Sequence, residues 1–296
     1  MPNGVLAMSV TSEDSATDVP EYDGMLLRAI LPTDRLIQKQ ALELQSAGLR
    51  SIAVIGETLG GEVDQRHRAM AEAYGACAGC QVASVTYPAE ADLYRYDWQA
   101  LGERALASAP DVIYLTSSDT SALLDTLFWT ERAGFRGNYY FAHGAYMATL
   151  HAEMPGSLVP ERFRSVDLAL PPSASLERFL ARYEARYGES FVPEPRLIAF
   201  ADYLVLLALA TTRVGADDPR QVAAAMKDLA APPGERFGPL DYVAAAAAVR
   251  AGRDIDFDGF SGPLDFDARG EVADGFVQEF GVDANGDVAT LPRERH

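Results

Sequence analysis

Several polar side chains that could bind a small molecule lie just after predicted strands. The strands at residues 51–56, 111–116 and 138–142 are continuous apolar runs, and they lead into segments 56–61, 116–120 and 142–146. The second segment carries hydroxyls and a carboxylate, and the third begins with His143. In a parallel sheet, ligands bind beyond the carboxyl ends of the strands. These segments are therefore the candidate binding loops.

Known catalytic signatures do not fit these loops. The sequence has no GxSxG motif, and segment 56–61 has neither GxGxxG nor GxxxxGK[ST] and no lysine, so nucleotide binding is not expected. His143 could serve as the base of an α/β hydrolase, but no nucleophile accompanies it. Alternatively, His143 lies on the protein surface or packs between lobes of the fold and has no catalytic role. We expect a protein without enzymatic activity and without a cofactor.

Two further motifs could suggest metal or redox chemistry. Cys77 and Cys80 form a CxxC pair, which suits a redox dithiol, half of a zinc site or a local disulfide. No second CxxC or paired histidine completes a zinc site, and the pair follows a helix end, so a structural role or a local disulfide is favoured. The acidic run at 254–259 resembles the start of a calcium loop, but a strand pattern follows, so a turn with solvated carboxylates is expected.

Composition restricts the partners. Of 296 residues, 48% are hydrophobic and the net charge is −18, so the chain can form a core but repels phosphate backbones and anionic membranes. No apolar run reaches the roughly 20 residues that span a bilayer. The start of the chain lacks the basic and apolar pattern of a secretory signal. Either the protein is cytoplasmic, or the segment that carries the signal is not in this chain.

Strands and helices alternate through the first half of the chain. Helices are predicted at 61–74, 98–108 and 120–133, and a further strand at 81–87. Such alternation indicates an α/β fold with a doubly wound parallel sheet, and residues 33–168 can form one complete lobe.

The second half contains many helices and few strands. Helices are predicted at 176–187, 195–212 and 219–229, with β-like stretches at 262–267 and 275–280. Residues 4–9 are the other strand available for a sheet beneath these helices. We expect this lobe to lack its first strands and to expose a strand edge and apolar helix faces.

A longer C-terminal motif resembles a known family. The segment 250–272 reads RAGRDIDFDGFSGPLDFDARGEV, which is similar to a signature of ABC-transporter substrate-binding proteins of the leucine/isoleucine/valine-binding type. Supporting stretches are LPTD at 31–34, YEARYG at 183–188, AFADYLVLLALA at 199–210 with Asp202 retained, and APPGE at 231–235. The resemblance extends over nearly the whole chain.

The resemblance implies the type I periplasmic-binding fold, in which two Rossmann-like α/β lobes joined by a hinge close on a solute. Residues 1–31 and 169–275 would form lobe one, incomplete at its N-terminal strands. Residues 32–168 would form lobe two, and 276–296 would return to the hinge and lobe two. The implied protein is extracytoplasmic and works with an ABC permease, without nucleic acid or direct membrane insertion. A ligand-sensing regulator on the same fold is the alternative.

The resemblance also assigns ligand-binding positions. In lobe one the matching positions for the ligand carboxylate are Thr11 and Ser12, with Ser9 beside them, because neutral donors can replace its hydration. In lobe two the matching positions are Leu59, Ser117, Ser118, Asp119, His143 and Tyr146. Leu59 lies where the family has a tyrosine, and His143 lies where it has an acid. Unless Asp119 replaces that acid, an acidic, amide or aromatic solute would suit the site better than an α-amino acid.

Overall fold

The structure is a computed structural model, and it describes residues 4–10, 24–59, 62–89, 95–117, 119–142, 147, 150, 160–283 and 287–291. The chain divides into two compact units. Unit 1 combines Met1–Thr33 with Leu168–Phe276, and unit 2 combines Asp34–Asp167 with Val277–His296. Each unit therefore contains segments that are far apart in the sequence.

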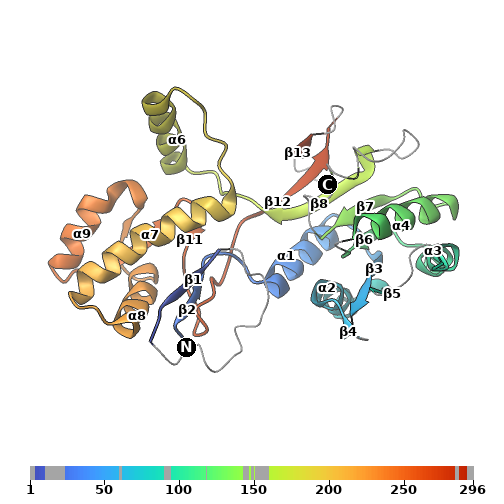
Figure 1. The fold of residues 1–296 in the computed structure, drawn as a ribbon, viewed down its shortest axis with the longest axis horizontal. Helices are drawn as coiled ribbons and strands as arrows, with labels where there is room; N and C mark the ends of the chain where they lie inside the picture. Colours follow the sequence, from blue (N-terminus) through green and yellow to red (C-terminus); the bar gives the residue numbers. More distant parts are fainter. Residues whose placement is uncertain are drawn as a thin grey trace. The chain divides into compact units, whose positions relative to one another are not determined.

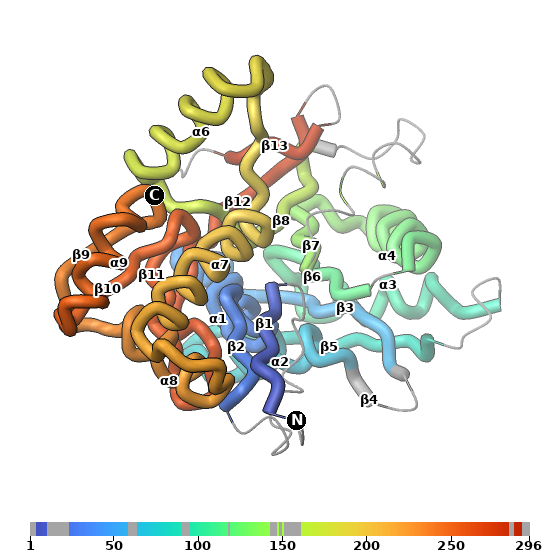
Figure 2. Tube along the Cα trace, turned by 60° about the vertical axis from the view of Figure 1, so that its left-hand side comes forward, coloured from blue at the N-terminus to red at the C-terminus, as the bar shows by residue number. Residues whose placement is uncertain are grey.

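Unit 2 is built on a sheet whose central strands are parallel (Figures 1 and 2). The strand order is β13-β12-β8-β7-β6-β3-β4, and β5 pairs with the other side of β3. The strands are β3 (Ser51–Leu59), β4 (Glu62–Val63), β5 (Gln81–Pro88), β6 (Val112–Leu115), β7 (Asn138–Phe141), β8 (Phe163–Leu168), β12 (Val277–Val282) and β13 (Val288–Thr290). The predicted α/β class is confirmed.

Helices cover both faces of this sheet. They are α1 (Thr33–Ser46), α2 (Gln65–Gly75), α3 (Trp98–Leu106) and α4 (Thr120–Arg132). Alternate strand residues such as Ile55 and Phe141 pack with Leu127 of α4 in one buried cluster. On the opposite face, Tyr114 of β6 donates a hydrogen bond to Gln40 of α1. Strands that are apolar on both faces fit this two-sided cover.

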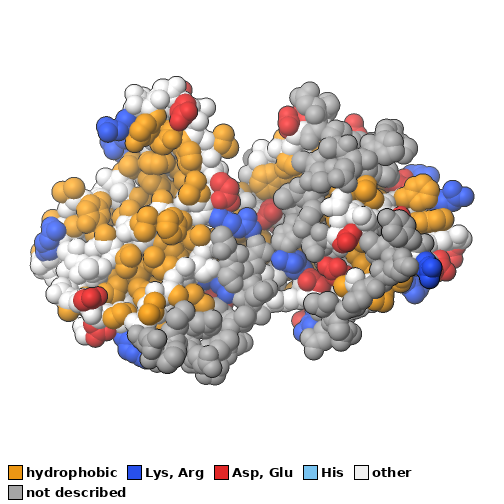
Figure 3. Space-filling model, viewed as in Figure 1, with side chains coloured by type: hydrophobic (Ala, Val, Ile, Leu, Met, Phe, Trp, Pro, Cys, Tyr) orange, Lys and Arg blue, Asp and Glu red, His pale blue; other side chains and the backbone are white. Residues whose placement is uncertain are grey.

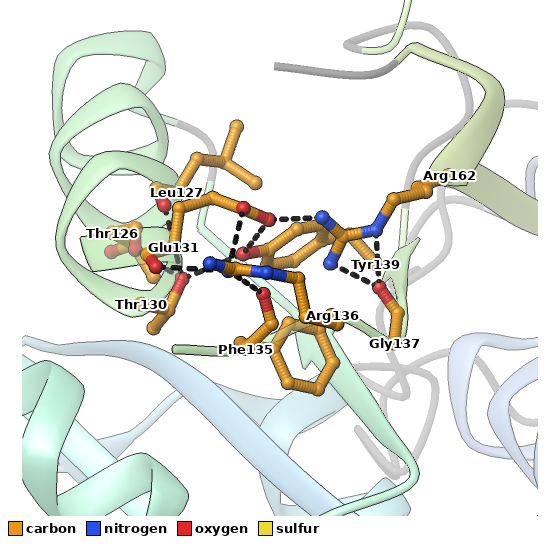
Figure 4. Close-up of polar contacts among 9 residues, drawn as sticks. All are labelled: Thr126, Leu127, Thr130, Glu131, Phe135, Arg136, Gly137, Tyr139 and Arg162. Atoms are coloured by element: carbon orange, nitrogen blue, oxygen red, sulfur yellow. Dashed lines mark hydrogen bonds and ion pairs between the residues drawn. The ribbon is translucent and has the colours of Figure 1, made fainter. Parts of the chain in front are cut away.

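A polar cluster joins the end of α4 to the starts of β7 and β8 (Figure 4). The Arg162 side chain forms an ion pair with Glu131, and its Nε donates to the Gly137 carbonyl at 2.7 Å. The Tyr139 hydroxyl donates to Glu131 Oε1 at 3.1 Å and lies 2.8 Å from the Thr130 hydroxyl. The cluster lies at the amino ends of the strands, so it holds the layers together at the edge opposite the candidate binding loops.

Unit 1 contains smaller sheets and longer helices. Strand β1 (Ala7–Ser9) pairs in parallel with β2 (Leu26–Arg28), and Arg28 forms a single parallel bridge with Glu271. A second sheet has the order β11 (Gly262–Pro263), β10 (Ile255–Gly259), β9 (Glu235–Phe237). The helices are α6 (Ala174–Tyr187), α7 (Pro195–Val214), α8 (Pro219–Ala230) and α9 (Tyr242–Arg250), together with the 3-10 helix η4 (Pro239–Asp241).

A buried carboxylate explains why Asp202 and the motif at 250–272 occur together. Asp202 is fully buried in α7, and it accepts hydrogen bonds from the Phe260 and Ser261 backbone N–H groups at 2.9 and 2.8 Å and from the Ser261 hydroxyl at 2.7 Å. A Cβ at Gly259 would lie 2.4 Å from the Asp202 carboxylate, so glycine is needed there. Burial raises the pKa of Asp202 to about 6, against the opposing effect of these hydrogen bonds.

Helix α7 is apolar on nearly all sides. It is long and apolar enough to cross a membrane by length and composition alone, although no uninterrupted apolar run of that length was predicted. The difference arises because Asp202 interrupts the apolar run but faces the protein interior. Only 39% of the apolar window of α7 is buried, so much of its surface is uncovered by the described parts of unit 1.

Three local predictions were wrong. The helix predicted from residue 61 begins at Gln65, because Asp64 caps it and Glu62–Val63 pairs with β3 instead. Residues 255–259 form strand β10 and not a turn with solvated carboxylates, because Asp256 is buried and paired with Arg236 at 3.4 Å. The stretch predicted at 262–267 forms a strand over Gly262–Pro263 only.

Candidate functional site

The candidate site in unit 2 lies where strands β3, β5 and β6 end. These strands run parallel, so their carboxyl ends share one edge of the sheet. After β6 the chain passes through Thr116 and Ser117, both buried, and enters α4 through Asp119. The edge therefore combines hydroxyl groups with the amino end of a 13-residue helix. Both features favour the binding of polar or anionic groups.

Asp119 has a defined structural role. It is the N-cap of α4, and its Oδ1 accepts a hydrogen bond from the Ala122 N–H at 2.9 Å. The Asp119 N–H in turn donates to the Ser117 hydroxyl at 3.0 Å. These bonds fix the backbone between β6 and α4 and keep the exposed carboxylate at the edge. The cap engages Oδ1, so Oδ2 is the oxygen that can face a ligand.

Tyr87 adds a phenol to the same edge. It is buried at the end of β5, opposite Glu57 of β3. Burial raises the pKa of Tyr87, and the neighbouring Ser117 side chain opposes the rise only in part. The phenol therefore stays protonated at neutral pH and remains a possible donor. Tyr87 was not among the predicted site residues, because its position at this edge depends on the pairing of β5 with β3.

His67 is a second residue that the sequence analysis did not identify. It lies in the first turn of α2 with 1% of its surface exposed, and its Nε2 is 2.7 Å from the Ser84 hydroxyl. Burial lowers the pKa of His67 to about 4, although the charge of Asp64 acts in the opposite direction. A Cβ at Gly56 would lie 2.0 Å from Thr116 Oγ1 and 3.0 Å from His67 Nδ1. Glycine at position 56 thus allows a neutral imidazole to approach the strand ends.

The nine predicted ligand-binding residues fall into three groups. Ser117 and Asp119 lie together at the strand ends of unit 2. Ser9 ends β1 in unit 1, where its carbonyl accepts from the Ala29 N–H at 3.2 Å. Leu59 is the last residue of β3, and its side chain lies outside the described part of the structure. The residues that also lie outside the described residues are Thr11, Ser12, Ser118, His143 and Tyr146.

The cysteine pair is a local disulfide. Cys77 and Cys80 are bonded to each other in the turn after α2, and the Arg50 guanidinium lies 3.4 Å from the Cys77 sulfur. Among the residues that the structure describes, no group of three or more His, Cys, Asp or Glu side chains could hold a metal ion. The acidic segment 254–259, which resembles the start of a calcium loop, contains the strand β10.

Comparisons with known proteins were made by sequence and by structure. No protein-family model matches the sequence, and no curated protein matches it. Many solved structures match the fold. The leucine-binding protein LivK of Thermotoga maritima has a TM-score of 0.67 at 17% identity, with 98% of this chain and 73% of that chain covered. A Desulfitobacterium hafniense ABC transporter substrate-binding protein in complex with Leu has a TM-score of 0.68 at 17% identity, with 98% and 74% covered.

This chain has the fold of the ABC transporter substrate-binding proteins. A solute-binding protein of R. palustris in complex with benzoate is also similar, with a TM-score of 0.62 at 13% identity. The match covers 98% of this chain and 71% of that chain. The resemblance inferred from the motif at 250–272 is confirmed at the level of the fold. Solved proteins of this fold thus include complexes with an amino acid and with an aromatic acid.

Proposed function

We propose that this chain is the solute-binding component of an ABC importer, which acts outside the cytoplasm and delivers a small polar or amino-acid-like solute to a permease. The observation that supports it most is the fold match over 98% of the chain to substrate-binding proteins. The strand-end site of unit 2 supports it further, since this fold class binds ligands at such edges. The proposed mechanism is hinge closure of two lobes on the solute, with no chemical conversion.

Asp119 is the proposed partner of a ligand ammonium. Its Oδ1 caps α4, and its Oδ2 can accept from a cation at the same edge. The Asp119 N–H donates to the Ser117 hydroxyl and its Oδ1 accepts from the Ala122 N–H, so the carboxylate is oriented before a ligand arrives. The ligand carboxylate would be bound by Ser9, Thr11 and Ser12. Because His67 is neutral at pH 7, it adds no charge that would repel the ammonium.

The edge also suits an alternative solute class. Ser117 and the protonated phenol of Tyr87 are neutral groups that can bind an acidic, amide or aromatic solute. His143 and Tyr146 would contribute to the same class. The choice between the two classes rests on whether the Asp119 charge takes part in binding.

Titration calorimetry of the full chain tests the function. The panel is leucine, isoleucine, glutamate, glutamine and benzoate, and we expect saturable binding of at least one member. If no member binds and none shifts the thermal melt, the proposed function is contradicted.

Two matched variants test the role of Asp119. Asp119→Asn retains a capping oxygen but removes the charge, whereas Asp97→Asn makes the same change at the N-cap of α3, where Asp97 accepts from Ala100. For an α-amino acid, we expect Asp119→Asn to raise the Kd by about 30-fold or more, because the ligand ammonium would be left without its anionic partner. Asp97→Asn should leave Kd unchanged. Equal affinity in both variants would remove Asp119 from the site without affecting the proposed function.

A further inference from the structure

The disulfide between Cys77 and Cys80 lies beside an arginine side chain. The Arg50 Nη1 is 3.4 Å from the Cys77 sulfur and 3.8 Å from the Cys80 sulfur, so one guanidinium contacts both sulfurs. The three residues lie in unit 2, where the chain leaves α2 and where β3 and β5 begin (Figure 1). Because β3 and β5 begin here, the pair lies at the edge of the sheet opposite the candidate solute site.

The Arg50 guanidinium faces sulfur in a chain that is rich in carboxylates. The chain has 43 Asp and Glu residues against 25 Lys and Arg residues, and Figure 3 shows basic side chains beside acidic ones at several places on one face. Among the residues that the structure describes, no carboxylate forms an ion pair with the Arg50 side chain. A neutral disulfide gains little from a positive charge, whereas the thiolate that forms on reduction is stabilised by it. The position of Arg50 therefore favours the reduced pair.

The disulfide contributes little as a structural crosslink. It joins residues three apart in the sequence, and closing so short a loop removes little entropy from the unfolded chain. The turn also has backbone bonds of its own, because the Cys80 N–H donates to the Cys77 carbonyl at 3.2 Å and the Gln81 N–H donates to the Arg50 carbonyl at 2.8 Å. The Asp111 carboxylate accepts from the Arg50 N–H at 2.8 Å. These bonds do not depend on the disulfide, so they keep both sulfurs near Arg50 after reduction.

We propose that Cys77 and Cys80 form a thiol–disulfide exchange site for an external dithiol, in which Arg50 stabilises the thiolate that leaves. Both cysteines are partly exposed, so an external thiolate can reach them. The sequence disfavoured a redox role because the pair follows a helix end, where the helix dipole does not stabilise an anion. Arg50 supplies the positive charge that the dipole does not. The site goes beyond the proposed solute-binding function and does not depend on it.

The exchange has two steps. In the first, a thiolate of the external dithiol bonds to the Cys80 sulfur, the bond between the two protein sulfurs breaks, and its electron pair leaves with the Cys77 sulfur, which is the one nearer to Arg50. In the second, the other thiolate of the dithiol attacks its own sulfur in the mixed disulfide and releases the Cys80 sulfur. The dithiol is oxidised to a disulfide, and the cysteine pair is reduced by two electrons. The two protons of the dithiol pass to the protein thiolates or to solvent.

Alkylation of the full chain by iodoacetamide tests the role of Arg50. Because the chain has two cysteines, the variant Cys80→Ser leaves Cys77 as its single thiol. In that background we expect Arg50→Gln to lower the alkylation rate at pH 7 by about threefold and to move its pH dependence to higher pH, since less of the thiol is ionised. Arg104→Gln is the matched control, because the Arg104 guanidinium contacts the Tyr96 hydroxyl instead of a sulfur. Equal rates with and without the Arg50 guanidinium overturn the proposal.

A redox titration of the native pair gives a second readout. The full chain is equilibrated at pH 8 with mixtures of reduced and oxidised dithiothreitol, free thiols are counted by mass after alkylation, and circular dichroism monitors the fold. We expect reversible reduction of the folded protein, and we expect Arg50→Gln to need about threefold more reduced relative to oxidised reagent for half-reduction. Arg104→Gln should leave this midpoint unchanged. A pair that is reduced only when the protein unfolds is a structural crosslink, and this result overturns the proposal.

Discussion

The longest apolar elements of the two units are buried to different extents. In unit 2 the apolar residues 52–55 of β3 and 112–115 of β6 are buried between α3 and α4 on one face and α1 on the other. In unit 1 the helix α7 is equally apolar but is covered mainly on the side that carries Asp202. The same driving force therefore produces a closed core in unit 2 and leaves an exposed apolar helix face in unit 1.

Their buried ionisable groups differ in a related way. Unit 1 buries Asp202, and burial raises its pKa to about 6, whereas unit 2 buries His67, and burial lowers its pKa to about 4. In both cases desolvation disfavours the charged form. The carboxylate must lose hydration to hold two backbone N–H groups, while the imidazole simply stays neutral. This contrast gives the two units opposite responses to acid.

The largest effect is expected from removing the buried carboxylate of Asp202 in unit 1. Asp202→Ala leaves the Phe260 and Ser261 N–H groups without their acceptor, so we expect a loss of about 3 kcal/mol in the free energy of unfolding. Asp228→Ala, which removes a mostly exposed ion pair of α8, should cost under about 1 kcal/mol. Urea unfolding at pH 7 measures both. Equal losses would show that the Asp202 hydrogen bonds add nothing to stability.

An effect of similar size is expected from His67 when the pH falls. Its pKa is about 4 in the folded protein and 6.5 in the unfolded chain, so the unfolded chain binds the extra proton between these values. Stability should therefore fall by about 3 kcal/mol between pH 6.5 and pH 4 through this residue. His67→Gln should flatten that part of the profile. An unchanged slope in the variant would mean that His67 is protonated in the folded state.

Asp202 should act in the opposite direction over an overlapping range. Its pKa is about 6 when folded and 3.8 when unfolded, so the folded protein binds the extra proton. The contribution of this carboxyl to stability rises by up to about 3 kcal/mol as the pH falls from 6 to 3.8. Comparing Asp202→Asn with wild type by urea unfolding at several pH values isolates this contribution. A difference between the two proteins that does not vary with pH contradicts it.

A smaller effect is expected at the candidate site. Asp119→Ala removes the N-cap of α4 and should cost about 1 kcal/mol, while Asp119→Asn should cost a few tenths at most. Thermal unfolding of the two variants separates the cap from the charge. If both variants lose the same stability, the charge of Asp119, and not its capping oxygen, stabilises the helix.

The smallest effect is expected at an isolated exposed side chain. Val243 of α9 is 81% exposed, so Val243→Ser should change the free energy of unfolding by less than about 0.5 kcal/mol. Urea unfolding checks this value. A loss above 1 kcal/mol would show that Val243 is covered in solution.

The central strands β3, β6 and β7 of unit 2 could be predicted, because each contains an apolar run and they alternate with helices. Strand β8 could not, since Arg164 and Asp167 break its apolar pattern. Helix α9 was missed because its run of alanines has little periodicity. Strand β10 resembled an acidic turn, and the partner that explains Asp256 is Arg236, which lies in another strand. Local pattern fails where pairing between distant residues decides the structure.

The residues of the candidate site also divide into those that local sequence order predicts and those that long-range packing decides. Ser117 and Asp119 could be placed at a strand end from the order of apolar and polar residues alone. His67 and Tyr87 could not, because their positions depend on how α2 and β5 pack against β3. A histidine within a helix and a tyrosine within a strand give no local sign of a shared edge. Their discovery required the three-dimensional pairing.

In the proposed function, this chain binds a solute through residues 9–12 and 116–122. Hydrogen–deuterium exchange of the full chain, with and without the tightest solute of the panel, tests it most directly. We predict slower exchange of backbone amides in residues 9–12 and 116–122 together, because the proposed function assigns both segments to the same ligand. Unchanged exchange in both segments at saturating solute would contradict solute binding at these residues.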